Sequence, residues 1–176
     1  PALFAAGSIL LVRRGFGPHA AAVAAGVWLY MTIALRSLVQ HAEAIRKPLA
    51  ANDLTGARRA LSMIVSRDTA TLDESEIVRG GVESIAENLI DAVTSALFWA
   101  VAGYLAGGAA GAAGAAVLLR AVNTLDASWG YKNERYLAFG RAAARIDDAA
   151  HFIPARLTVP AIALAALLLR GSFGRT

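Results

Sequence analysis

The sequence predicts an all-α polytopic membrane protein, and three observations lead to that prediction. Of its 176 residues, 57% are hydrophobic and only 17% are charged, against roughly 25% in soluble domains, and the mean hydropathy is +0.51. Ala and Gly are abundant, as in helices that approach one another closely within bilayers. No stretch shows the strict polar and apolar alternation of a strand. We expect a single helical membrane domain over 1–176, as a piece of a longer chain.

The first elements expected are two apolar helices joined by a basic turn. Residues 1–12 form a short apolar run, 13–18 contain two arginines, and 20–35 are again uncharged. The second run crosses a hydrocarbon core of about 30 Å only if Arg36 extends its side chain to the interface. The helix is expected to continue with polar residues until Pro48 interrupts it.

A short amphipathic helix is expected next. Asn52 or Asp53 caps it, because either side chain can accept a hydrogen bond from the first turn. Its apolar residues recur at helical spacing and predict a face that docks on the bundle or lies in the membrane interface. That face consists of Ala57, Leu61, Ile64 and Val65.

Residues 67–91 form the first of two polar blocks. Carboxylates are costly beside membrane-like sequence, so a functional site is the default interpretation of such a block. Asp73 and Glu76 have the spacing of a capping box and predict the start of a helix. Along this helix we expect an apolar stripe opposite an acidic edge. The stripe is Val78, Val82, Ile85, Ala86, Leu89 and Val93, and the edge is Glu76, Glu83, Glu87 and Asp91.

Three carboxylates of this helix are candidates for a metal site. Glu83, Glu87 and Asp91 are spaced i, i+4 and i+8 and therefore share one helical face. Like charges so placed destabilise a helix by roughly 0.2–0.5 kcal/mol per pair, a cost that a bound cation removes. Mg²⁺ suits them because it takes one or two carboxylates together with phosphate oxygens and waters. The alternative is a solvated acidic face, or one that pairs with arginines.

Candidates for ligand binding lie in both polar blocks. Arg67 beside Asp68 is either a ligand contact or a local ion pair, and the amide of Asn88 can orient a ligand. Lys132 and Arg135 can hold phosphate, the first as a point charge and the second as a fork. The alternative for these two is an ordinary basic loop beside the membrane.

The longest membrane segment expected is 92–119, which carries no charge but contains several glycines. It is either one long span or a re-entrant hairpin. A site that uses both polar blocks requires the hairpin, or acidic helices sunk beside a water-filled cavity. A further helix is expected over 135–152, ended by Pro154 and Pro160.

The second polar block, 123–157, contains further acidic candidates. Asn123 and Asp126, spaced i, i+3, either cap a helix or form the rim of a site. Asp147 and His151 are spaced i, i+4 and could share a metal ion. The alternative is a ladder of salt bridges along the helix, formed by Arg141, Arg145 and Asp148.

Composition disfavours several other functions. The net charge of +4 and pI of about 10.0 would suit nucleic-acid binding, but Lys and Arg are scattered and flank the apolar runs. The absence of Cys removes disulfides, thiolate catalysis and cysteine–zinc sites. The sequence has no P-loop, no dinucleotide-binding glycine motif and no nucleophile elbow.

The two blocks contain a series of short motifs. These are RDT, LD, VES, AEN with Asp91, and LFW in 67–99, then RAVNTLD, GYKNERY, FG, DD and IPARL in 120–157. In this order and with these gaps, residues from about 58 to 157 resemble the CobD/CbiB family of cobalamin biosynthesis, the adenosylcobinamide-phosphate synthases. The chain differs from the family's usual pattern at Ala92, Ala96 and His151, where glycine, proline and asparagine are usual. The family's N-terminal G-D-P…H-P and C-terminal H-x-S-P-N elements are absent from this sequence.

The resemblance implies an integral enzyme of the bacterial inner membrane. We expect its site to face the cytoplasm, because ATP and the amino-alcohol phosphate are found there. The implied reaction is an ATP-dependent ligation that requires Mg²⁺. It joins adenosylcobyric acid, a corrinoid, to (R)-1-amino-2-propanol O-phosphate or a related amino-alcohol phosphate. ATP is expected to convert a carboxylate into an acyl phosphate, which the amine attacks. The protein must then neutralise phosphate charge and position the substrates.

On this reaction we assign hypothetical roles to the candidate residues. The catalytic candidates are Glu83, Glu87, Asp126, Asp147 and Asp148. The candidates for substrate or phosphate binding are Arg67, Asp68, Asn88, Asn123, Tyr131, Lys132, Arg135 and Arg156. The metal-binding candidates are Glu83, Glu87 and Asp91, with Asp147 or Asp148 as a second ligand or a base.

A second hypothesis comes from a different class of protein. A non-catalytic membrane regulator similar to AmpE-like proteins, or a transporter of cations or corrinoids, could use intramembrane carboxylates as a relay. The partners expected are the two substrates and the lipid bilayer, with no nucleic acid. A second copy of the chain or other enzymes of the cobalamin pathway are the protein partners considered.

Overall fold

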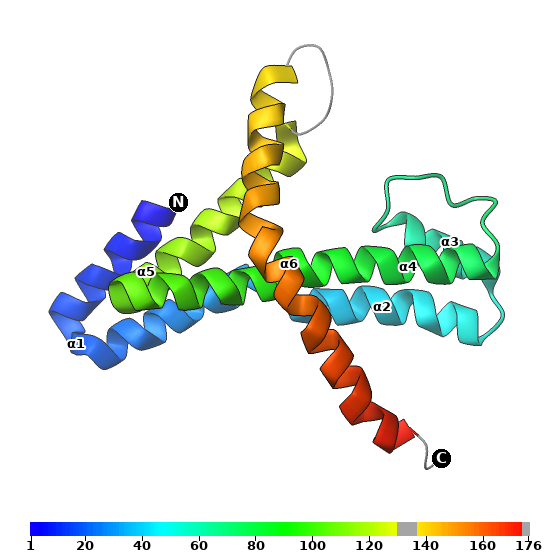
Figure 1. The fold of residues 1–176 in the computed structure, drawn as a ribbon, viewed down its shortest axis with the longest axis horizontal. Helices are drawn as coiled ribbons and strands as arrows, with labels where there is room; N and C mark the ends of the chain where they lie inside the picture. Colours follow the sequence, from blue (N-terminus) through cyan, green and yellow to red (C-terminus); the bar gives the residue numbers. More distant parts are fainter. Residues whose placement is uncertain (130–136, 174–176) are drawn as a thin grey trace. The chain divides into compact units, whose positions relative to one another are not determined.

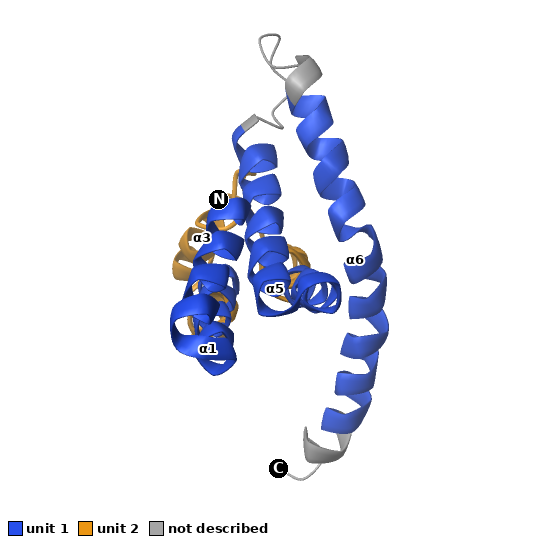
Figure 2. Ribbon diagram, turned by 90° about the vertical axis from the view of Figure 1, so that its left-hand side faces the viewer, with its two compact units in different colours: residues 1–33, 94–176 blue, residues 34–93 orange. Residues whose placement is uncertain are grey.

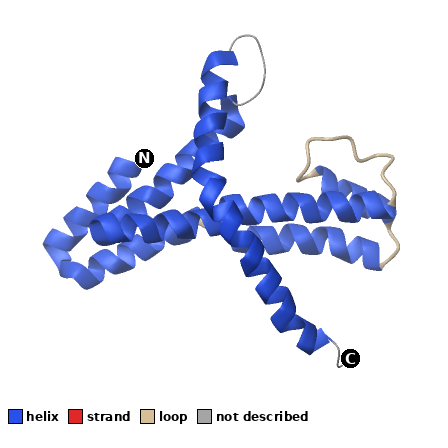
Figure 3. Cartoon of the chain, in the orientation of Figure 1, coloured by secondary structure: helices blue, strands red, loops and turns tan. Residues whose placement is uncertain are grey.

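The computed structural model describes residues 1–129 and 137–173, and these form helices joined by loops (Figure 3). No strand occurs within these two ranges, so the all-α prediction is confirmed. The elements are α1 (Ala2–Thr32), α2 (Leu35–Ala50), α3 (Leu54–Ser62), α4 (Glu74–Leu89), the π-helical segment η1 (Ile90–Thr94), α5 (Ser95–Trp129) and α6 (Leu137–Phe173) (Figure 1). The longest of the described loops lies between α3 and α4.

The helices form two compact units, where the sequence predicts one helical domain (Figure 2). Unit 1 consists of Pro1–Ile33 and Thr94–Thr176. Unit 2 is the segment Ala34–Val93, which contains α2, α3 and α4. Each unit has its own buried apolar cluster.

Unit 2 is a small three-helix bundle. Its core consists of Ile45 of α2, Ala57 and Leu61 of α3 and Ile77 of α4. The predicted face of α3 is confirmed for Ala57 and Leu61, which are fully buried, but α3 ends at Ser62, so Ile64 and Val65 follow the helix and are only partly buried. The predicted cap is Asp53, whose carboxylate accepts a hydrogen bond of 2.8 Å from the backbone nitrogen of Gly56.

The buried face of α4 differs from the predicted stripe. Val78 and Val82 are 45% and 63% exposed. The buried residues are instead Ile77, Gly80, Gly81 and Ser84. The small residues of α4 let α2 and α3 approach closely. Hydrophobic periodicity does not identify glycine or serine as buried, because neither is apolar enough to mark a face. The prediction of this stripe was therefore wrong for its first two valines.

Unit 1 is built around two helical hairpins (Figure 1). Helix α1 breaks at Gly17, whose φ of 87° lies in the region that favours glycine. Helix α5 breaks at Gly107 and Gly108. Where its arms meet, a Cβ on Gly103 would collide with the backbone carbonyl of Gly111. Of the two alternatives left open for 92–119, the structure thus has the hairpin.

The two hairpins pack against each other through small side chains. Ala5, Ile9, Ala21, Ala25, Ala113 and Val117 form the buried cluster. Beside it, the indole nitrogen of Trp28 donates to the hydroxyl of Ser8 at 3.1 Å. Within the described ranges, three helical stretches are long and apolar enough to cross a membrane, namely Ala2–Ala50, Glu74–Ser128 and Gly140–Leu169. The chain is therefore that of a membrane protein.

Helix α6 does not end at its prolines, so that prediction was wrong. Both Pro154 and Pro160 lie inside the helix. A proline lacks the N–H that would bond the carbonyl four residues earlier, which for Pro154 is Ala150. The indole nitrogen of Trp99 donates to the Ala150 carbonyl at 2.9 Å. A side chain from α5 thus supplies the missing donor, and the helix continues.

Candidate functional site

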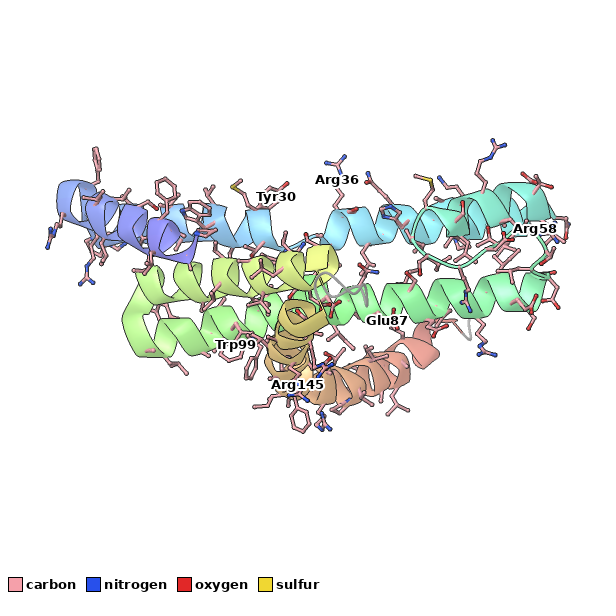
Figure 4. All side chains as sticks on the ribbon, turned by 90° about the horizontal axis from the view of Figure 1, so that it is seen from above. Tyr30, Arg36, Arg58, Glu87, Trp99 and Arg145 are labelled. Carbon is pink, nitrogen blue, oxygen red and sulfur yellow. The ribbon has the colours of Figure 1, made fainter. Side chains whose placement is uncertain are left out.

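A charged pocket of about 240 Å³ lies within unit 2. One cationic and two acidic side chains line it, those of Arg67, Glu83 and Glu87. The remaining walls are Ile64, Val65, Ser66, Gly80 and Ser84. The pocket thus brings together residues from the loop after α3 and from α4, and Figure 4 labels Glu87 on its helix.

The capping box that the sequence predicts sets the position of α4. The carboxylate of Asp73 accepts from the backbone nitrogen of Glu76 at 2.8 Å, and the carboxylate of Glu76 accepts from that of Asp73 at 2.9 Å. The i, i+4 spacing of Glu83 and Glu87 then places both at the same pocket. This part of the site follows directly from local sequence.

The loop that carries Arg67 is tied to α3. The guanidinium of Arg58, labelled in Figure 4, donates to the carbonyl of Leu72 at 2.8 Å, and the hydroxyl of Thr69 donates to the carbonyl of Arg58 at 3.0 Å. Asp68 accepts from the backbone nitrogen of Ala70 at 2.9 Å, so its carboxylate shapes the turn.

Arg67 reaches over α4 toward the carboxylate of Glu83. The Nη2–Oε2 distance is 3.4 Å, and the two side chains are 46% and 54% exposed. Such exposed pairs contribute only about 0–1 kcal/mol to stability, so the pair is a weak structural element. Gly80 makes room for it, because a Cβ there would lie 2.5 Å from Nη2 of Arg67.

The third carboxylate predicted for the metal is placed differently. Asp91 lies in η1, a π-helical turn in which α-helical spacing no longer fixes the face of a residue. It is not among the residues that line the charged pocket. Among the described residues, no group of three or more His, Asp or Glu side chains is placed to hold a metal ion. Two carboxylates at one pocket still fit Mg²⁺, which takes its other ligands from phosphates and water.

A second cavity in unit 2, of about 100 Å³, contains a residue that the sequence analysis did not select. His41 of α2 lines it together with Asn88 of α4. Ile64 and Ser84 line both this histidine cavity and the charged pocket. Only the i, i+4 spacing of Ser37 and His41 on one helix was visible in the sequence, and it does not point to α4.

Unit 1 contains a polar cluster between α5 and α6. The hydroxyl of Ser95 lies 2.6 Å from Nδ1 of His151. The amide of Asn123 lies 3.0 Å from Nε2 of the same imidazole. Both ends of the α5 hairpin therefore meet at His151, which is buried. Asp147 joins the cluster with its Oδ1 3.4 Å from Nε2.

The orientation of the Asn123 amide follows from its neighbours. With its nitrogen toward the cluster, it donates to the carbonyl of Leu119 at 3.1 Å and to Oδ1 of Asp147 at 2.8 Å, and it faces Nε2 of His151. In that orientation the two amide hydrogens are directed at Leu119 and Asp147, and Nε2 of His151 lies 3.0 Å from the same nitrogen. The cluster then fixes both Asn123 and Asp147.

The other residues predicted for the second block are placed less centrally. Oδ1 of Asp126 is buried and has no hydrogen-bond partner within the described ranges. Asp148 is exposed on α6. The guanidinium of Arg156 lies 3.5 Å from the ring centre of Phe152 and donates to its carbonyl at 2.9 Å. Tyr131, Lys132 and Arg135 lie outside the described residues.

Comparison with known proteins extends this picture. The family model described as CobD/Cbib protein matches residues 1–173. The "Cobalamin biosynthesis protein CobD" of Chromobacterium violaceum is 56% identical over 130 residues, which are 74% of this chain and 39% of that protein. The protein of the same name from Leptospira interrogans is 46% identical over 145 residues, or 82% and 44% of the two chains. The chain spans less than half the length of these curated relatives, and no solved structure matches it.

Proposed function

The chain belongs to the CobD/CbiB family, and on that premise we propose that the full-length protein is an amide-forming ligase of cobalamin biosynthesis. Its substrates are adenosylcobyric acid and (R)-1-amino-2-propanol O-phosphate, or a related amino-alcohol phosphate. The protein acts in the bacterial inner membrane with its site open to the cytoplasm, where ATP is made.

The charged pocket is the observation that supports this function best. Ligation through an acyl phosphate requires a place where phosphate charge is neutralised. One pocket of about 240 Å³ is lined by a guanidinium, which can pair with phosphate, and by two carboxylates, which can bind a metal ion. Arg67 binds the phosphoryl group of the amino-alcohol phosphate directly, because its fork matches phosphate oxygens.

The two glutamates act through the metal. Glu83 and Glu87 would hold Mg²⁺, which would supply the positive charge that neutralises the phosphates of ATP. Their exposure leaves the carboxylate oxygens accessible to such a ligand. Arg67 at present lies beside Glu83, and a phosphoryl group would compete with that weak pair.

The polar cluster of unit 1 serves the corrinoid. Asn123 and Asp147 are held by His151 and Ser95, so their side chains are positioned before any substrate binds. Oδ1 of Asp126 is an acceptor without a partner in the described chain, which suits a primary amide of a corrinoid side chain. Asp147 and Asp148 remain the candidates for a second metal ligand.

A direct assay tests the proposal. The full-length protein that carries this sequence is placed in lipid nanodiscs with adenosylcobyric acid, the amino-alcohol phosphate, ATP and Mg²⁺, and the amide is detected by mass. We expect one amide per ATP consumed, and none when the amine, ATP or Mg²⁺ is omitted. Corrinoid or cation flux in vesicles without ATP turnover would instead support the transporter hypothesis.

A further inference from the structure

The histidine cavity contains an imidazole whose tautomer is fixed by its own helix. Nδ1 of His41 lies 2.7 Å from the carbonyl oxygen of Ser37. A carbonyl only accepts, so Nδ1 must donate and hold the proton of the neutral ring. Nε2 then has a lone pair, and no hydrogen-bond partner for it occurs within the described ranges. It is an available acceptor.

Asn88 adds a second acceptor to the same cavity. Its amide nitrogen donates to the carbonyl of Ser84 at 2.8 Å, which leaves Oδ1 as the unused end. Within the described ranges Oδ1 has no partner either. No Asp, Glu, Lys or Arg is among the residues that line the cavity. His41 and Asn88 both line this uncharged cavity, and each has an unused acceptor atom. Two such acceptors match a ligand group rich in donors, and a primary amine is such a group.

The two pockets share walls, which relates this amine position to the phosphate position. Ile64 and Ser84 line both of them. The hydroxyl of Ser84 donates to the carbonyl of Ile64 at 3.0 Å, so the shared wall is a fixed feature of unit 2. A volume of about 100 Å³ holds roughly three groups the size of a water molecule. This is enough for an aminoalkyl end, while an attached phosphoryl group lies at Arg67.

We propose that the histidine cavity and the charged pocket form one binding site for an aminoalkyl phosphate, in which His41 accepts the proton of the substrate ammonium. This inference rests on the proposed function. It adds the position of the amine, the residue that activates it and the role of Asn88, which orients the nitrogen. Imidazole is the side chain best suited to accept a proton near neutral pH.

The step balances as follows. The ammonium gives one proton to Nε2 of His41 and keeps the electron pair on nitrogen. The amine attacks the acyl carbon, so a C–N bond forms and the C–O bond to phosphate breaks. The nitrogen electron pair becomes the new C–N bond, and phosphate leaves with the electron pair of the C–O bond and takes the second amine proton. The products are the amide, hydrogen phosphate and a protonated His41, which loses its proton to solvent.

A binding experiment tests the amine position without turnover. The affinity of the full-length protein for 1-amino-2-propanol O-phosphate and for its analogue without the amine is measured by calorimetry in nanodiscs. We expect wild type to prefer the amine by about tenfold or more, since hydrogen bonds to charged groups are worth about 1.5–3 kcal/mol. His41→Ala should lose that preference. His19→Ala, a change of the exposed histidine on α1, should keep it.

A kinetic experiment tests the proton transfer. Hydroxylamine is unprotonated at neutral pH and traps an activated carboxylate without the help of a base. His41→Ala should lower the rate of amide formation by about 100-fold, as expected for loss of a general base, and should leave hydroxamate formation nearly unchanged. An equal loss in both rates would contradict the role, because it would indicate a general defect of the site.

The outcomes separate this inference from the proposed function. If the wild-type protein binds 1-amino-2-propanol O-phosphate and the analogue without the amine with equal affinity, the inference is overturned, whatever the activity of the protein. If binding prefers the amine and depends on His41, but no amide is formed, the proposed binding site is supported and the proposed ligase function is contradicted. Amide formation at the wild-type rate by His41→Ala would retain the ligase and reject His41.

Discussion

At the scale of single residues, one indole nitrogen explains how α6 passes a proline. Trp99 donates to the Ala150 carbonyl, which Pro154 leaves without its helical donor. Trp99 lies in the LFW motif and Pro154 in the IPARL motif, more than fifty residues apart. The sequence contains both motifs but does not show that they meet, because the contact depends on how α5 and α6 pack.

This contact predicts a coupling between two substitutions. Trp99→Phe should destabilise the protein by about 0.5–2 kcal/mol, because it leaves the carbonyl unsatisfied. In a Pro154→Ala background the new N–H can bond the Ala150 carbonyl, so the same change should cost less. SDS titration of the four proteins in micelles measures the coupling. Equal costs in the two backgrounds would show that the indole bond does not replace the helical one.

Two neighbouring glycines of α4 form a matched pair for testing Arg67. A Cβ on Gly80 would lie 2.5 Å from Nη2 of Arg67, whereas a Cβ on Gly81 would meet Ile45 at an ordinary 3.4 Å. Gly80→Ala should displace the guanidinium and lower kcat/KM for the amino-alcohol phosphate by about tenfold. Gly81→Ala should leave kcat/KM unchanged and stabilise the helix by up to about 1 kcal/mol.

Steady-state kinetics and thermal unfolding of both variants provide the check. An unchanged kcat/KM in Gly80→Ala would mean that Arg67 does not bind the phosphate. A loss in both variants would place the effect in the bundle rather than in the pocket.

The residues of the candidate site divide by how local their placement is. Glu83 and Glu87 were predictable, because helical spacing alone brings them to one face. The placement of Asp91 was not predictable, because no sequence feature in 90–94 indicates a π-helical turn. His41 and Arg67 reach α4 from other elements, and a single sequence does not specify such contacts.

At the scale of elements, glycines convert the longest uncharged segment into a hairpin. The sequence showed that 92–119 is interrupted by glycines, but helix length and hydropathy fit a single span equally well. The decisive features are the backbone conformation at Gly107 and Gly108 and the close approach of Gly103 to Gly111. As a result, Ser95 and Asn123 reach the same imidazole.

The close approach predicts a strong response to a single methyl group. Gly103→Ala should destabilise unit 1 by at least about 1–3 kcal/mol, because the new Cβ meets backbone that cannot move aside. Gly7→Ala is the control, since a Cβ on that helical glycine meets nothing within 4 Å. It should be neutral or slightly stabilising. Thermal unfolding in micelles compares the two, and equal melting temperatures would rule out the tight crossing.

At the scale of the whole molecule, the class of protein was predictable and its division into units was not. Low charge, high hydropathy and abundant small residues predict helices in a membrane, and three stretches of the described chain meet that expectation. The separation of unit 2 depends on a second buried cluster around Ile45 and Leu61. Periodicity locates each face of such a cluster but does not show which faces meet.

The measurement that tests the central claim most directly is amide formation by Glu87→Gln in the full-length protein. Glu74→Gln, a change of an exposed carboxylate in the first turn of the same helix, is the control. If Glu87 holds the magnesium nucleotide, its variant should lose at least about 100-fold in rate, need more Mg²⁺ for half-maximal rate and keep its melting temperature. Glu74→Gln should resemble wild type. A Glu87→Gln protein that forms amide at the wild-type rate and with the wild-type Mg²⁺ dependence would contradict the account.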